Sequence, residues 1–161
     1  MRFLLLVAMI AIIAITPCIA AAVPVKGGVP SALSLLDLSN RAVDLPSFKG
    51  SFTILFFFAS WSKSCDKEVE MLNELYDAYE KKDLQIIGVS FDRDADEVKQ
   101  FVKDKKIKFD IFVDKKLVSI DKYAILILPT TFTINKNGEI AGIYVDFDSN
   151  LKQSLAKFLG H

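Results

Sequence analysis

The chain has 161 residues, which suits one domain, and its 20 basic residues balance its 20 acidic residues. Apolar residues make up 52% and charged residues 25%, the usual balance of a globular protein with ample material for a core. A chain without net charge has no general attraction for nucleic acid or for an anionic membrane surface, so we expect neither as its main partner.

The N-terminus has the pattern of a secretory signal. A short positive start precedes an uninterrupted apolar run at residues 3–15, and the small residues at 20–22 suit a signal peptidase. The run is shorter than the ~20 residues that a membrane-spanning helix needs. We therefore expect residues 1–22 to be a cleaved signal peptide, and the protein to be exported to the bacterial periplasm or another extracytoplasmic space. An uncleaved membrane anchor and a lipoprotein acylated at Cys18 are the alternatives.

Cleavage would leave Cys65 as the one cysteine of the mature chain, because Cys18 lies within the signal. One cysteine cannot form an internal disulfide, so the core alone must hold the fold. Cys65 would then be a free thiol in an oxidising compartment.

Residues 23–59 contain an extended segment, a short hairpin or arm, and the first buried strand. Residues 23–32 are rich in proline and glycine and predict an extended lead-in to one domain at 33–161. Residues 33–45 alternate loosely and favour a short hairpin or an extended arm. The continuous apolar run at 52–59 is typical of a central strand that is buried on both faces.

Helical and strand patterns alternate after this run. Apolar residues recur every three or four positions within 65–82, which predicts an amphipathic helix. An Asn-Gly turn at 137–138 predicts a hairpin. The order of elements predicts an α/β fold with a mixed central β-sheet and helices on both faces. The other predicted strands are 84–90, 109–113, 130–134 and 140–145, and the other predicted helices are 95–106, 116–123 and 151–159.

The junction between the first apolar strand and its helix carries the residues with chemistry. There Trp61-Ser62-Lys63-Ser64-Cys65 leads into the helix. Backbone N–H groups at a helix N-terminus favour an anion, and Lys63 adds positive charge, so both lower the pKa of a nearby thiol. This setting suits a thiolate at Cys65.

Two motifs carry a family resemblance. The segment FFASWSKSC at 57–65 resembles the F-W-A-x-W-C-x-x-C motif of the TlpA/ResA-like thiol–disulfide oxidoreductases, with Ser62 in place of the first cysteine. The segment LPTTF at 128–132, followed by INKNG, is similar to the family's x-P-T-T-F-x-I-D-x-x-G. The resemblance covers most of the mature chain and implies a thioredoxin-like fold with Pro129 as a cis-proline facing the motif.

The resemblance also implies a site for a client segment. In the family, the backbone before the cis-proline pairs with an extended segment of the partner. The substrate-binding residues implied here are Trp61, Lys63, Ser64, Leu128, Pro129 and Thr130.

Ser62 is the main departure from the family. There the first cysteine attacks a substrate disulfide and the second resolves the mixed disulfide. A hydroxyl cannot form a stable bond to sulfur, so Ser62 excludes the dithiol mechanism. Cys65 occupies the resolving position, where burial would raise its pKa while the helix N-terminus and Lys63 would lower it. The sequence leaves that balance open.

A second departure concerns proton transfer. The position where many thioredoxins carry a buried acid corresponds to the surroundings of Phe56, which are apolar, and we expect no proton relay elsewhere. The only histidine is the last residue, His161, so no Cys–His pair is expected. No cluster has metal-ligand spacing, and we expect neither a metal nor a cofactor.

Three functions fit these residues. As a monothiol enzyme, the protein would use Cys65, with Ser62 beside it, to form a mixed disulfide with a protein or a low-molecular-weight thiol or disulfide client. As an inactive binding module, it would hold a client at the groove between Trp61 and Pro129. As a peroxidase, it would use the S-x-x-C pattern of peroxiredoxins, although Phe58 replaces their proline and their arginine has no match. We expect a monomer in each case.

Overall fold

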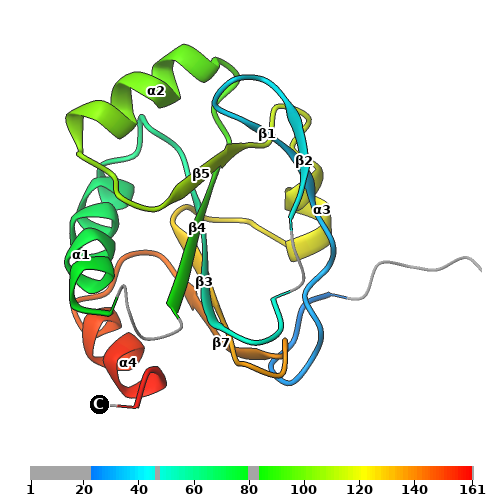
Figure 1. The fold of residues 1–161 in the computed structure, drawn as a ribbon, viewed down its shortest axis with the longest axis vertical. Coiled ribbons are helices and arrows are strands. Elements are labelled where there is room, and N and C mark those ends of the chain that lie inside the picture. The colour runs from blue at the N-terminus through cyan, green and yellow to red at the C-terminus, as the bar shows by residue number, and fades with distance from the viewer. Residues whose placement is uncertain (1–22, 46–47, 80–83, 161) are drawn as a thin grey trace, which may run out of the picture.

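The computed structural model of the protein describes residues 23–45, 48–79 and 84–160. The predicted signal peptide, with Cys18, and the terminal His161 lie outside these residues. Across the described residues, the chain forms one seven-stranded sheet and four helices (Figure 1). No helix in that part of the chain is long and apolar enough to cross a membrane.

The sheet is mixed, as predicted, and has the strand order β2-β1-β5-β4-β3-β6-β7. The three central strands β3, β4 and β5 are parallel, and antiparallel strands extend the sheet on both sides. The bounds predicted for β4, β6 and β7 are confirmed, and residues 33–45 contain a hairpin. The strands are β1 (Ser34–Asp37), β2 (Ala42–Asp44), β3 (Phe52–Phe58), β4 (Leu84–Ser90), β5 (Asp110–Val113), β6 (Thr130–Ile134) and β7 (Ile140–Val145).

The helices differ from their predicted bounds where local contacts fix their ends. The helices are α1 (Lys63–Tyr79), α2 (Ala95–Asp104), α3 (Val118–Tyr123) and α4 (Leu151–Phe158). The predicted helix at 95–106 ends early because Lys106 adopts a left-handed φ of 51°. The predicted helix at 116–123 starts late because the Asp114 carboxylate accepts the Val118 N–H at 3.0 Å and so fixes the first turn there.

The sheet is covered by helices on both faces. Ile54, Phe56 and Phe58 of β3 point to the face where α1, α2 and α4 pack, and all three are fully buried. Leu55 and Phe57 point to the other face, where they join the core that includes α3. Figure 1 shows α1, α2 and α4 on one side of the sheet and α3 on the other. Burial on both faces explains the unbroken apolar run in the sequence.

The lead-in lies against the edge of the sheet. The Gly27 N–H donates to the Ile140 carbonyl at 2.8 Å, and the Ile140 N–H donates to the Gly28 carbonyl at 2.8 Å. Residues 27 and 28 therefore cover the start of β7, which is otherwise an edge strand.

Candidate functional site

The motif occupies a tight turn between β3 and α1. The Ser62 N–H donates to the Ala59 carbonyl at 3.1 Å, and the Ser62 carbonyl accepts the Asp66 N–H at 3.3 Å. Ser62 is thus the last residue of the turn and precedes the first residue of α1. Cys65 follows in the first turn of α1, as the sequence predicts.

Cys65 is a free thiol that is sealed from solvent, with 0% of its surface exposed. Burial raises the pKa of the thiol above its usual value, and the nearby carboxyls of Glu68 and Asp66 raise it further. Hydrogen bonds with the Ser62 side chain and the Ala59 backbone oppose this shift without reversing it. The balance that the sequence left open therefore favours a neutral, buried thiol.

Glu68 is the buried acid that the sequence analysis did not find. It lies three residues after Cys65, is 1% exposed, and accepts a hydrogen bond from the Thr131 hydroxyl. Burial raises the pKa of Glu68 to about 7. This acid comes from α1 and not from the surroundings of Phe56 in β3, so the sequence did not point to it. Its place in the apolar stripe of the helix, next to Val69, was the available signal.

A groove opens beside the motif turn. It has a volume of about 340 Å³, and no charged side chain lines it. Trp61 is 74% exposed at its edge, and Leu126 is 92% exposed. The lining residues are Trp61, Ser62, Phe91, Ile120, Ile125, Leu126 and Leu128. The groove can therefore take an apolar side chain and offers two protruding apolar contacts.

The loop before β6 contributes Leu126 and Leu128 to the lining of the groove. The Leu128–Pro129 peptide bond is cis, which confirms the implied cis-proline. The Pro129 carbonyl accepts the Asp146 N–H at 2.8 Å, and the Thr130 hydroxyl donates to the Ile127 carbonyl at 2.6 Å. Among the described residues, the backbone of Leu128 has no hydrogen-bond partner.

The structure brings together only part of the predicted set. Trp61, Ser62 and Leu128 line the groove. Lys63 and Ser64 lie in the first turn of α1, outside the lining, and Pro129 and Thr130 are buried at the start of β6. Four lining residues were not predicted, because they come from the end of β4 and from α3 and the loop after it, far from the motif in the sequence: Phe91, Ile120, Ile125 and Leu126.

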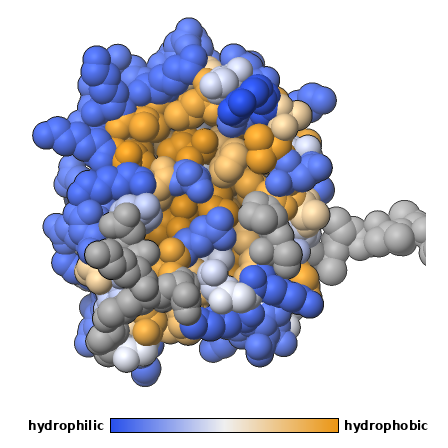
Figure 2. All heavy atoms as spheres, in the orientation of Figure 1, coloured by the Kyte–Doolittle hydropathy of each residue, from blue (hydrophilic) through white to orange (hydrophobic). Residues whose placement is uncertain are grey.

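A second hollow continues the apolar surface past Leu126. It has a volume of about 290 Å³, and Leu126 lines both hollows. Val23 and Pro24 of the lead-in and Ile143 and Val145 of β7 also line it. Most of the exposed large apolar side chains described for the chain lie along these two hollows. On the face seen in Figure 1, apolar residues gather near the centre and polar residues surround them, as Figure 2 shows.

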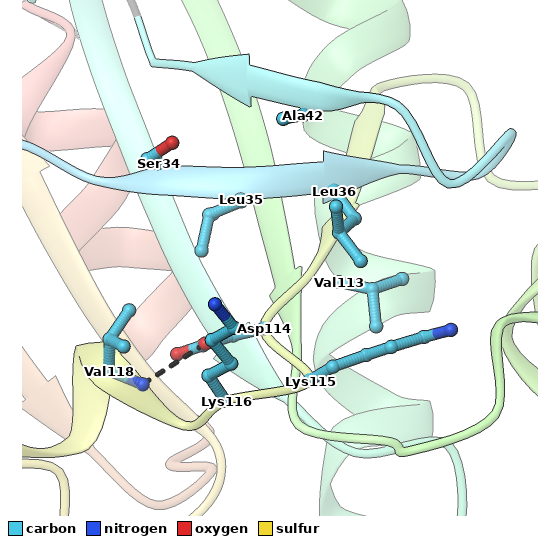
Figure 3. Close-up of a pocket in the computed structure, with 9 residues that line it drawn as sticks. All are labelled: Ser34, Leu35, Leu36, Ala42, Val113, Asp114, Lys115, Lys116 and Val118. Atoms are coloured by element: carbon cyan, nitrogen blue, oxygen red, sulfur yellow. Dashed lines mark hydrogen bonds between the residues drawn. The ribbon is translucent and has the colours of Figure 1, made fainter.

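Another hollow lies between the β1–β2 hairpin and the loop after β5 (Figure 3). It has a volume of about 260 Å³ and shares no lining residue with the motif groove. Its buried acid, Asp114, already caps α3 by accepting the N–H groups of Val118 and Ser119 and the Ser119 hydroxyl. The residues that line this hollow are Ser34, Leu35, Leu36, Ala42, Val113, Asp114, Lys115, Lys116 and Val118.

Known proteins resemble this chain in sequence and in fold. Residues 28–143 match the AhpC/TSA family. "Thiol-disulfide oxidoreductase ResA" of Bacillus thuringiensis subsp. konkukian is 38% identical over 104 residues, which cover 65% of this chain and 60% of that protein. "Sporulation thiol-disulfide oxidoreductase A" of Bacillus subtilis is 30% identical over 135 residues, with 82% of this chain and 81% of that protein covered.

A solved structure has a similar fold. The crystal structure of a "putative Thiol:disulfide interchange protein DsbE" from Chlorobium tepidum has a TM-score of 0.77 and 25% identity, and the match covers 83% of this chain and 94% of that one. The chain thus spans about 60% of the length of the ResA proteins that it matches, and nearly all of the DsbE structure.

Proposed function

Because the chain belongs to the AhpC/TSA family, as a TlpA/ResA-like redoxin, we propose that it holds an extended client segment beside Trp61 and does so without disulfide exchange. The observation that carries this proposal is the contrast within one site. Trp61 is 74% exposed beside an apolar groove, while Cys65 is fully buried with a raised pKa. The site of the family reaction is kept, but Ser62 replaces the attacking cysteine and the remaining sulfur, that of Cys65, is buried.

The groove favours a client with an apolar side chain. Trp61 and Leu126 supply exposed apolar area on its rim, and no charged group lines it. Aromatic contacts of this kind carry much of the energy in protein recognition. The open backbone of Leu128 would pair with the client main chain, in the way that an edge strand accepts a peptide. We also place the protein outside the cytoplasm, on the strength of the signal pattern at residues 1–22.

Monothiol exchange is the second candidate, favoured by the names of the relatives and by the retained thiol at Cys65. The Cys65 thiolate would attack a client disulfide, form a mixed disulfide and release the other client sulfur as a thiolate. An external thiol would then displace the client. This sequence needs an exposed, ionised sulfur, so burial of Cys65 makes it secondary. The same burial weighs against the peroxidase function.

Binding of a short, cysteine-free peptide with a central phenylalanine tests the proposal. The probe carries a fluorescein label, and its anisotropy is measured against protein concentration. We expect Trp61→Ala to weaken binding by about tenfold or more, because the rim loses its aromatic anchor. Cys65→Ala should leave the affinity unchanged.

Val29→Ala is the matched control, since Val29 is 79% exposed and lies outside the groove. It should bind the peptide like the wild type. Equal weakening by the Val29 and Trp61 variants would show non-specific adhesion, and loss of binding in Cys65→Ala would show that the thiol takes part. Either result contradicts the proposal.

A further inference from the structure

The carboxylate of Asp92 joins the end of β4 to the motif turn. Asp92 is 2% exposed. It accepts the Ser60 N–H at 2.9 Å, the Ser60 hydroxyl at 2.8 Å and the Ser90 hydroxyl at 2.6 Å. Three donors from two chain segments thus converge on one buried carboxylate, and charge-assisted bonds of this kind are the strong ones.

These bonds begin where the sheet stops. The β3–β4 ladder ends at the pair Phe58 and Ser90, and one more backbone bond follows, from the Phe91 N–H to the Phe58 carbonyl at 2.9 Å. Past that point the strands separate. The bonds from Ser60 to Asp92 are the next link, and they fix the second residue of the turn at 59–62 against the end of β4.

The turn that Asp92 fixes has two roles at the site. It presents Trp61, which follows Ser60 directly and is 74% exposed. It also directly precedes Cys65, which is fully buried. Burial raises the pKa of this thiol, and interactions with the Ser62 side chain and the Ala59 backbone, both within the turn, oppose the shift. A change in the position of Ser60 would therefore reach the client contact and the thiol together.

We propose that Asp92 is a positioning residue that locks the turn at residues 59–62, so that it presents Trp61 to the client and seals Cys65. The part that concerns the client rests on the proposed function, and the sealing of Cys65 does not. Release of the lock would let the turn lift from β4 and give solvent access to the thiol without unfolding of the sheet.

The test compares Asp92→Ala, Asp92→Asn and Ser60→Ala in the full chain. The rate of iodoacetamide labelling at Cys65 is followed by peptide mass spectrometry, which separates Cys65 from Cys18. We expect Asp92→Ala to label about tenfold faster or more, because three bonds are lost. Asp92→Asn keeps one acceptor oxygen and should partly restore protection. Ser60→Ala removes one bond and should give a smaller increase in the same direction.

Trp61 supplies a second readout, since it is the only tryptophan of the chain. Its fluorescence anisotropy should fall in Asp92→Ala, as the turn becomes mobile. The matched control is Asp114→Asn, which weakens another buried carboxylate with three donors, at the start of α3. It should lower the free energy of unfolding and leave the Trp61 anisotropy unchanged.

Labelling of Cys65 that rises no more in the Asp92 variants than in an Asp114→Asn protein of equal stability would overturn the proposal. If Asp92→Ala does not fold, Ser60→Ala answers the same question. Faster labelling in a protein that binds no peptide would uphold the lock and refute the proposed function. Peptide binding by the wild type, together with unchanged Cys65 labelling in the variants, would uphold the proposed function and refute the lock.

Discussion

Cys65 and Glu68 lie one turn apart on the buried side of α1, and burial raises the pKa of both. Each charge would be formed in a poorly solvated place, and the Glu68 carboxylate also raises the pKa of the thiol. The neutral forms are therefore the ones that the fold favours. A hydroxyl at Ser62 and a neutral thiol at Cys65 leave the motif without a strong nucleophile.

The stability of the fold should depend on pH through Glu68. Its folded-state pKa of about 7 exceeds the ordinary value of 4.5, so the folded state binds the proton more tightly than the unfolded state does. The contribution is complete below about pH 4.5 and is lost as the pH rises through about 7. We expect the free energy of unfolding to fall by about 3 kcal/mol over this range. Urea unfolding at about pH 5 and about pH 8 measures the change.

Glu68→Gln is the matched variant, because the amide oxygen can still accept the Thr131 hydroxyl and the side chain no longer titrates. Its free energy of unfolding should change much less between the two pH values. A wild-type protein that gains stability as the pH rises would contradict the assignment of a raised pKa to Glu68.

At the scale of elements, α1 packs its apolar side chains against the sheet, whereas the loop between α3 and β6 exposes an apolar side chain at the groove. Leu72 of α1 is fully buried, and Leu126 of the loop is 92% exposed. Leu72→Ala should lower the free energy of unfolding by about 2–5 kcal/mol. Leu126→Ala should change it by less than about 0.5 kcal/mol and should weaken peptide binding. Denaturant unfolding and peptide anisotropy separate the two effects, and a stability loss in Leu126→Ala as large as that in Leu72→Ala would refute the separation.

Glycine at position 88 lets three neighbours pack over the middle of β4. A Cβ there would lie 2.5 Å from the Ile111 Cδ1 and 3.2 Å from the Phe58 Cε1. Gly88→Ala should therefore lower the free energy of unfolding by about 1–3 kcal/mol.

Adding Ile111→Val removes the Cδ1 atom and should restore part of that loss. A thermodynamic cycle over the two single variants and the double variant measures the coupling. Strictly additive effects would show that the contact between these two positions is not the cause.

For the whole molecule, the sequence predicts the sheet better than the site. The strands are predicted well because each apolar run is buried on one or both faces, as β3 is. Glu68 was missed because its partner Thr131 is 63 positions away, and no local pattern shows that α1 and β6 meet there. The predicted set of groove residues was incomplete for the same reason, since Phe91, Ile120 and Leu126 come together only after folding.

The ends of the helices were also set by contacts that periodicity does not reveal. Asp114 fixes the start of α3 through the Val118 N–H, and the left-handed Lys106 marks the end of α2. Family motifs pointed to Trp61 and Cys65 as site residues. They did not show that one would be exposed and the other sealed, because exposure depends on how the turn at 59–62 lies against the rest of the fold.

A site that binds without reacting should protect Cys65 from oxidised glutathione. The wild-type protein is incubated with the disulfide in buffer and in denaturant, and the Cys65 peptide is weighed by mass spectrometry. We expect a glutathione adduct in denaturant and almost none in the native protein, where the sulfur is buried and its pKa is raised. Rapid formation of the adduct in the native protein would contradict it and would favour the monothiol enzyme.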